Sequence, residues 1–238
     1  MNGLSILATI AARGGSKGIK NKNLRPLLGK PLIAHTLLQI KSWGKFDNLV
    51  VSTDSEAIAA VARAYGAEVP FLRPAELAGD SSGKMDALRH CLISCESHFA
   101  RRFDAVFDLD ATAPVRRTAD LEAMVALSSE SGADCVFSVT AARKNPYFNM
   151  VEQNADGTVS LSKTLPGTVR RRQDAPKVYD MNASMYVYRR DFLLDEGNKM
   201  PYSGRSVAYV MGEEAAFDID NEMDFAIVEM IMAREGLA

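Results

Sequence analysis

The chain has 238 residues, of which 47% are hydrophobic and 24% are charged, and its formal net charge is −2 at pH 7. This composition predicts a soluble globular protein with a full hydrophobic core, and the near-neutral charge argues against a nucleic-acid partner or an anionic membrane surface. No apolar stretch reaches the roughly 18 residues of a membrane span, and the start of the chain lacks a signal-peptide pattern. The three cysteines have no paired spacing, so we expect core thiols and a cytoplasmic location.

The first half of the chain alternates short apolar runs with segments of helical periodicity. Strands are predicted at residues 4–12, 47–52, 68–72, 105–109 and 135–139. Helices are predicted at residues 31–43, 55–65, 84–99 and 119–129. This alternation indicates a Rossmann-like α/β fold with a mostly parallel sheet and helices on both faces.

The second half of the chain changes character. Residues 143–180 are rich in polar and turn-forming pieces, and they precede two strand-like runs at 183–188 and 206–210 and a helical segment at 222–234. No linker or repeat divides the chain. We therefore expect a single domain over residues 1–238, with 143–180 as a small inserted excursion.

Residues 13–23 form the most informative segment, Arg-Gly-Gly-Ser-Lys-Gly-Ile-Lys-Asn-Lys-Asn, directly after the first predicted strand. Its glycines allow backbone N–H groups to approach an anion closely, and its cations and amides add charge and hydrogen-bond donors. The glycine spacing matches neither the Walker loop nor the dinucleotide fingerprint. The pattern predicts a site for a polyphosphate that leaves or reacts, and the alternative is a solvated basic turn.

Polar clusters also follow two later strands, at residues 52–54 and 108–116. In an open α/β sheet, ligands bind beyond the carboxyl ends of the strands. We therefore expect these clusters to meet the glycine-rich loop at one edge of the sheet.

Two carboxylates, Asp218 and Asp220, stand two residues apart near the end of the chain. In an extended segment both side chains leave the same face, where like charges disfavour each other unless a cation lies between them. Oxygen ligands predict Mg²⁺, with Mn²⁺ as the alternative, and the chain offers no His/Cys set of the kind that zinc prefers. The competing interpretation is that Asp220 caps the helix beginning near Asn221.

Taken together, these segments resemble the CMP-sialic acid synthetases, or acylneuraminate cytidylyltransferases, which also activate legionaminic and pseudaminic acids. The resemblance is carried by residues 12–23, 29–33, 51–54, 172–173, 182 and 217–220. It implies a nucleotidyltransferase of the GT-A-like kind, in which residues 143–180 contribute to the sugar pocket and to a homodimer contact. It also implies Mg²⁺-dependent transfer of CMP from CTP to a nine-carbon α-keto acid sugar, with release of pyrophosphate.

The same resemblance implies roles for individual residues. The expected nucleotide-binding residues are Arg13, Gly15, Ser16, Lys17, Lys22, Asn23, Arg73 and Ser82. The expected sugar-binding residues are Asp110, Arg172, Gln173 and Asn182, and the expected metal ligands are Asp218 and Asp220. Arg13, Lys22 and Asp220 are the expected catalytic residues, and Arg170 and Arg171 leave the register of Arg172 open by one residue.

The sequence departs from the family pattern at Asp110, where a glutamine is usual. Asp110 either reads a differently substituted sugar, such as one with an extra amide donor, or shares the metal with Asp218 and Asp220. The first alternative favours a bacterial sialic-acid analogue. Rival functions are a Kdo or sugar-1-phosphate nucleotidyltransferase, and a non-catalytic nucleotide-binding module.

Overall fold

The computed structural model describes the chain except for residues 1–3, 16–17, 80–81, 168 and 238. A six-stranded sheet forms its centre, with the strand order β10-β6-β9-β5-β1-β4. The strands are β1 (Ile6–Ala11), β4 (Asn48–Ser52), β5 (Ala105–Leu109), β6 (Cys135–Ala141), β9 (Tyr179–Arg189) and β10 (Ser206–Val210). β9 is antiparallel to both of its neighbours, and the other pairings are parallel. The predicted Rossmann-like, mostly parallel sheet is confirmed.

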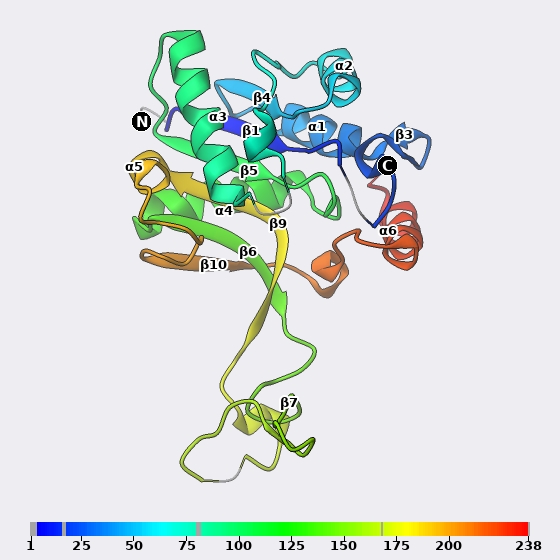
Figure 1. Ribbon diagram of the computed structural model, residues 1–238, viewed down its shortest axis with the longest axis vertical. Coiled ribbons are helices and arrows are strands. Elements are labelled where there is room, and N and C mark those ends of the chain that lie inside the picture. Colours follow the sequence, from blue (N-terminus) through cyan, green and yellow to red (C-terminus); the bar gives the residue numbers. More distant parts are fainter. Residues whose placement is uncertain (1–3, 16–17, 80–81, 168, 238) are drawn as a thin grey trace.

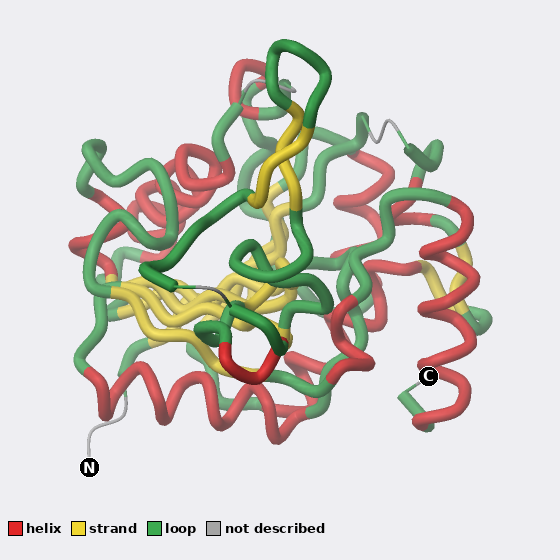
Figure 2. The backbone as a smooth tube through the Cα atoms, turned by 90° about the horizontal axis from the view of Figure 1, so that it is seen from below, coloured by secondary structure: helices red, strands yellow, loops and turns green. Residues whose placement is uncertain are grey.

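Helices cover both faces of this sheet (Figures 1 and 2). They are α1 (Leu32–Trp43), α2 (Glu56–Ala64), α3 (Lys84–Phe99), α4 (Thr118–Ser131), α5 (Arg190–Leu194) and α6 (Glu222–Glu235). Alternate residues of β1 explain the two faces, because successive side chains of a strand point to opposite sides. Ile6, Ala8 and Ile10 pack in a core cluster with side chains of α1, α2 and α4, whereas Leu7 packs in a second cluster with α3 and α5.

A third apolar cluster lies beyond the sheet and joins distant parts of the chain. It contains Ile19 of the glycine-rich loop (residues 13–23), Ile219 of the acidic segment (residues 217–220), and Phe225, Val228 and Met232 of α6. Each of these side chains is at most 5% exposed. Since apolar burial stabilises a fold roughly in proportion to the area removed from water, this cluster holds the loop and the acidic segment together.

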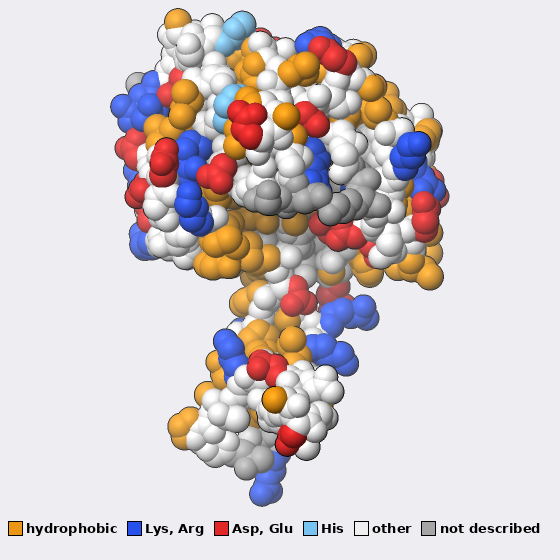
Figure 3. Space-filling model, viewed as in Figure 1, with side chains coloured by type: hydrophobic (Ala, Val, Ile, Leu, Met, Phe, Trp, Pro, Cys, Tyr) orange, Lys and Arg blue, Asp and Glu red, His pale blue; other side chains and the backbone are white. Residues whose placement is uncertain are grey.

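The segment between β6 and β9 projects from the body of the molecule (Figure 1). It carries the small hairpin of β7 (Val151–Gln153) and β8 (Val159–Leu161), whose residues are all exposed, and the 3₁₀ turn η3 (Arg172–Asp174). We call residues 143–178 the extension. In Figure 3, hydrophobic side chains gather on the underside of the body and around the neck of this extension.

The remaining elements are short. They are the antiparallel pair β2 (Pro26–Leu27) and β3 (Lys30–Pro31) and the 3₁₀ turns η1 (Lys22–Leu24), η2 (Ala75–Leu77) and η4 (Glu213–Ala216). None of the helices in the described part of the chain is both long and apolar enough for a membrane crossing. The three cysteines are buried free thiols, as predicted.

The predicted strand at residues 68–72 is wrong. Only Glu68 bridges the sheet, next to Val50 of β4, and the following residues form no ladder. Pro70 lies in this run, and proline has no backbone N–H to donate to a neighbouring strand. The apolar run instead leads the chain across the strand ends to Arg73.

Candidate active site

The glycine-rich loop leaves the end of β1 and is held in place from two sides. The backbone N–H of Gly14 donates to Asp54 Oδ1 at 2.8 Å, just beyond the end of β4. The Asn23 side chain, buried at 6% exposure, donates to the Arg13 carbonyl at 3.3 Å. The loop is therefore held by Asp54 from outside and by its own Asn23 from within. Ser16 and Lys17, both expected to bind the nucleotide, lie outside the described residues.

The loop and the acidic segment are in direct contact. Lys22 Nζ donates to the backbone carbonyl of Ile219 and lies 3.3 Å from Asp220 Oδ1. A Cβ atom placed on Gly18 would lie 1.9 Å from the Asp220 carbonyl oxygen, so only glycine fits this approach. The structure thus brings together two segments that are about two hundred residues apart in the chain.

The two carboxylates of the acidic segment are not used as helix caps. The side chain of Asn221 caps α6 by accepting from the backbone N–H groups of Met223 and Asp224, at 2.9 and 3.1 Å. Asp218 Oδ1 is buried and has no hydrogen-bond partner among the described residues, and the Asp220 side chain is 76% exposed. An orphaned buried carboxylate oxygen is costly unless a cation or donor arrives to meet it.

These carboxylates fit a magnesium ion whose other ligands come from a substrate. Within the described residues, no group of three or more His, Cys, Asp or Glu side chains could hold a metal. Mg²⁺ is commonly bound through one or two carboxylates, with phosphate oxygens and water completing the octahedron. Asp220, which lies 3.3 Å from Lys22 of the cationic loop, and the buried carboxylate of Asp218 match that pattern.

Two adjoining cavities at the carboxyl ends of β1 and β5 form one cleft. Their volumes are about 240 and 230 Å³, and both are lined by Ala11, Arg13 and Asp110. Arg73, Ser82 and Lys84 line the first, and Lys22, Asn23 and Asp220 line the second. Most of the nucleotide-binding residues expected from the sequence therefore border this cleft. Gly15 is exposed in the same loop, and a Cβ placed on it would meet nothing within 4 Å.

Arg73 and Ser82 are both anchored by backbone carbonyls. Arg73 is 7% exposed, its Nε donates to Ser52 Oγ at 3.1 Å, and its Nη2 donates to the Ser52 carbonyl. Burial lowers the pKa of Arg73 from its ordinary value. Ser82 Oγ donates to the Glu76 carbonyl at 2.6 Å. Arg73 is a pre-oriented cation on the wall of the cleft.

Arg116 shapes the segment that follows β5. Its side chain is almost fully buried and donates to the backbone carbonyls of Asp110 and Ser184, each at 2.6 Å. Burial lowers the pKa of Arg116 to about 10. Because Arg116 bonds the carbonyl of Asp110, directly after β5, and that of Ser184 in β9, it fixes the backbone of Asp110 relative to β9. The backbone N–H of Ile219 donates to the Thr112 carbonyl at 2.9 Å, which joins this loop to the acidic segment.

Lys84 is a residue of the cleft that the sequence analysis missed. It is the first residue of α3, and its Nζ lies 2.9 Å from Asp108 Oδ2 and 2.5 Å from Asp110 Oδ2. Burial alone would lower the pKa of Lys84, but the two carboxylates raise it well above its ordinary value. A lysine at a helix N-terminus opposes the helix dipole, and that local conflict was the available signal for a special role.

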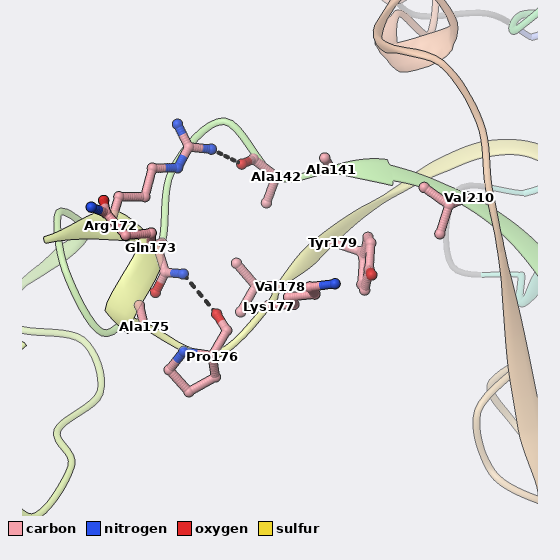
Figure 4. A pocket seen from close by; sticks show the side chains of 11 residues that line it. Ala141, Ala142, Arg172, Gln173, Ala175, Pro176, Lys177, Val178, Tyr179 and Val210 are labelled. Atoms are coloured by element: carbon pink, nitrogen blue, oxygen red, sulfur yellow. Dashed lines mark hydrogen bonds between the residues drawn. The ribbon is translucent and has the colours of Figure 1, made fainter.

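The residues expected to bind the sugar lie in three places. Asp110 borders the cleft, whereas Arg172 and Gln173 line a cavity of about 640 Å³ at the base of the extension (Figure 4). Arg172 Nη2 donates to the Ala142 carbonyl, and Arg171 pairs with Asp174 at 2.9 Å. Asn182 is 4% exposed, and its amide accepts from Ser138 Oγ at 2.7 Å and donates to the Ala215 carbonyl at 3.0 Å. Arg172, Gln173 and Asn182 therefore do not line the cleft of their own chain.

The cytidylyltransferase family model matches residues 7–228 of the chain. The chain belongs to the cytidylyltransferase family. It is 44% identical over 232 residues to the post-translational flagellin modification protein B of Campylobacter coli, with 98% of this chain and 97% of that protein covered. It is 43% identical over 233 residues to the CMP-N,N'-diacetyllegionaminic acid synthase of Campylobacter jejuni, again with 98% and 97% covered.

A more distant sequence relative and a solved structure are also similar to this chain. The chain is 30% identical over 232 residues to the N-acylneuraminate cytidylyltransferase of Escherichia coli, covering 97% of this chain and 53% of that protein. Among solved structures, CMP:2-keto-3-deoxy-manno-octonic acid synthetase complexed with CTP has a TM-score of 0.70 at 19% identity, with 97% and 99% of the two chains covered. The nucleotidyltransferase fold expected from the sequence is confirmed, and the chain is a nucleotidyltransferase of the cytidylyltransferase family.

Proposed function

We propose that this cytidylyltransferase transfers CMP from CTP to a nine-carbon α-keto acid sugar, in a Mg²⁺-dependent reaction that releases pyrophosphate. The observation that carries the proposal is the meeting of Arg13 and Lys22 with Asp220 around one cleft. Cations on one side and carboxylates on the other suit a metal-bound triphosphate. Two relatives support this substrate class: one, 43% identical, is named as a CMP-N,N'-diacetyllegionaminic acid synthase, and the other, 30% identical, as an N-acylneuraminate cytidylyltransferase.

In the proposed reaction, the anomeric hydroxyl of the sugar attacks the α-phosphorus of CTP. The new bond between the sugar oxygen and phosphorus forms as the bond to the pyrophosphate oxygen breaks, and the hydroxyl proton is released. Arg13 and Lys22 stabilise the negative charge that accumulates on the departing pyrophosphate. The cleft also holds the two reactants in line, which lowers the entropic part of the barrier. When bound, Mg²⁺ would supply further charge stabilisation beside Asp218 and Asp220.

We favour N,N'-diacetyllegionaminic acid, or a similarly substituted bacterial acid, over N-acetylneuraminic acid. Asp110 presents an acceptor-only carboxylate at the junction of the two cavities, where family members usually have an amide. The relative from Campylobacter jejuni is named as the synthase for that diacetylated sugar. The product would be a cytoplasmic nucleotide sugar, and the buried free thiols are compatible with that location.

We propose further that the active form is a homodimer. Val151 and Val159 of the extension, and Tyr179 at the start of β9 next to it, expose 60%, 62% and 43% of their full surface, and no described residue of the extension belongs to a core cluster. Exposed apolar side chains of this kind are typical of contact surfaces. A second chain would cover these side chains. Its Arg172 and Gln173 would also reach the cleft of the first chain, which the first chain's own Arg172 and Gln173 do not border. The guanidinium of Arg172 would then pair with the sugar carboxylate.

The decisive experiment incubates the purified protein with each nucleoside triphosphate and a panel of nine-carbon acids, Kdo and sugar 1-phosphates. The expected result is pyrophosphate release only with CTP and a nine-carbon acid, fastest with a diacetylated one. Turnover with Kdo or with a sugar 1-phosphate instead would refute the substrate class. If the protein binds CTP but turns over none of the acceptors, with or without Mg²⁺, it would be a non-catalytic binding module.

A further inference from the structure

Lys84 and Asp110 form an ion pair on the floor of the cleft, between its two cavities. Lys84 Nζ reaches Asp110 Oδ2 at 2.5 Å and Asp108 Oδ2 at 2.9 Å, and it lies 4.4 Å from the centroid of the Tyr186 ring. The Lys84 side chain is 33% exposed, and it borders the same cavity as Arg13 and Arg73. The ammonium group is thus held by Asp108, Asp110 and the Tyr186 ring, and its remaining side faces the cleft.

The two carboxylates that share Lys84 are not equivalent. Asp108 is fully buried, and its Oδ1 accepts from the Thr9 hydroxyl at 2.9 Å, so a ligand cannot reach it. Asp110 is 20% exposed and lines both cavities. Its Oδ2 is engaged by Lys84, and no side chain of the described residues donates to its Oδ1. Asp110 therefore offers one oriented acceptor oxygen to whatever spans the junction of the cavities.

Among the charged groups around Asp110, Lys84 is the cation that lowers the pKa of its carboxyl group. The ionisable groups that face it from the packed elements are Lys84 of α3, Asp108 of β5, Arg116 after β5, Tyr186 of β9, Asp218 before α6 and Arg13 across the cleft. Burial is the largest influence, and it raises the pKa of Asp110. The pair with Lys84 lowers this pKa, whereas the charges of Asp108 and Asp218 raise it. Arg116 meets the backbone carbonyl of Asp110 rather than its carboxylate.

We propose that Lys84 is a positioning residue that keeps Asp110 as an oriented acceptor, and that the sugar taken by this chain presents an N–H or O–H donor to it. This inference rests on the proposed function and names the feature of the sugar that the cleft selects. Under this proposal Asp110 binds the sugar and does not share the metal ion with Asp218 and Asp220.

The test compares Lys84→Met, Asp110→Asn and the double variant with the wild-type protein. The matched control is Lys45→Met, which removes an exposed lysine–carboxylate pair with Glu122 (2.7 Å) outside the cleft. The Michaelis constants for CTP and for the sugar are measured between pH 6 and pH 9, and thermal unfolding shows whether each variant is folded. Lys84→Gln replaces Lys84→Met if the latter fails to fold.

Loss of a hydrogen bond to a charged group is expected to raise the sugar KM of Asp110→Asn about tenfold or more at every pH. Without Lys84, Asp110 ionises only at higher pH, so the sugar KM of Lys84→Met should rise as the pH falls. The double variant should match Asp110→Asn and show no pH dependence, the KM for CTP should stay within about threefold, and Lys45→Met should match the wild type.

Three results would overturn the inference. The first is an additive loss in the double variant, and the second is a pH dependence that persists without the Asp110 carboxylate. The third is an increase in KM for CTP with the sugar KM unchanged, which would show that Lys84 binds the nucleotide. Turnover of a nine-carbon acid by the wild-type protein would leave the proposed function intact in each case.

Discussion

Substitution of Gly18 by alanine is the most direct perturbation of the contact between the loop and the acidic segment. The added Cβ would lie 1.9 Å from the Asp220 carbonyl oxygen, whereas ordinary van der Waals contact begins at 3.4 Å. The two segments must therefore separate by about 1.5 Å, the difference between these distances. A displacement of about 1 Å in an active site can cost about a hundredfold in rate, so kcat/KM of Gly18→Ala should fall by at least about a hundredfold.

The assay is pyrophosphate release with saturating Mg²⁺, accompanied by thermal unfolding to establish that the fold persists. Gly15→Ala is the comparison within the same loop, because a Cβ there meets nothing within 4 Å and the residue is not among the glycines with positive φ. It should lose far less activity than Gly18→Ala. Activity of Gly18→Ala within about threefold of the wild type, or equal losses in the two variants, would refute the proposed role of this close contact.

Three further outcomes are expected. Asp220→Asn should be almost inactive at every Mg²⁺ concentration tested, and recovery of wild-type kcat at high Mg²⁺ would contradict its role as a ligand. If a second chain completes the site, mixing the inactive variants Asp220→Asn and Arg172→Ala should restore activity, whereas a site built within one chain would give none. Glu96 accepts from Arg190 at 2.8 and 2.9 Å, and this pairing lowers the pKa of Glu96 below its ordinary 4.5. Glu96→Gln should therefore cost about 1–2 kcal/mol of unfolding free energy at pH 7, as measured in urea, and the cost should vanish as the pH falls well below 4.5. A cost that is independent of pH would contradict this assignment.

The alternating strands and helices of the first half could be predicted because the local sequence pattern of each agrees with its place in the fold. The apolar run at 105–109 and the periodic segment at 84–99 coincide with β5 and α3. The run at 68–72 misled because Pro70 removes a ladder donor, which apolarity alone does not reveal. The expectation that residues 52–54 and 108–116 meet the glycine-rich loop followed from strand ends that share one edge. The contact of that loop with the acidic segment has its physical cause in the apolar packing of Ile19 and Ile219 with α6.

Other features of the site depend on contacts between residues that are distant in the chain, and local sequence patterns do not specify their partners. Lys84 lies far along the chain from Asp108 and Asp110, and only the packing of α3 on the sheet brings them together. The position of Asn182, whose amide is occupied by Ser138 and Ala215, likewise follows from the pairing of β6 with β9. The place of Arg172 depends on how the extension leaves the body, and few local signals in its polar sequence specify that path.

The central claim is that the glycine-rich loop and the acidic segment bind a single magnesium-bound CTP. A crystal structure of the protein with CTP and Mg²⁺ tests it most directly. We expect the triphosphate beside Arg13 and Lys22, and a magnesium ion about 2.0–2.1 Å from carboxylate oxygens of Asp218 and Asp220. A triphosphate bound elsewhere, or a metal ion that neither carboxylate contacts, would contradict the claim.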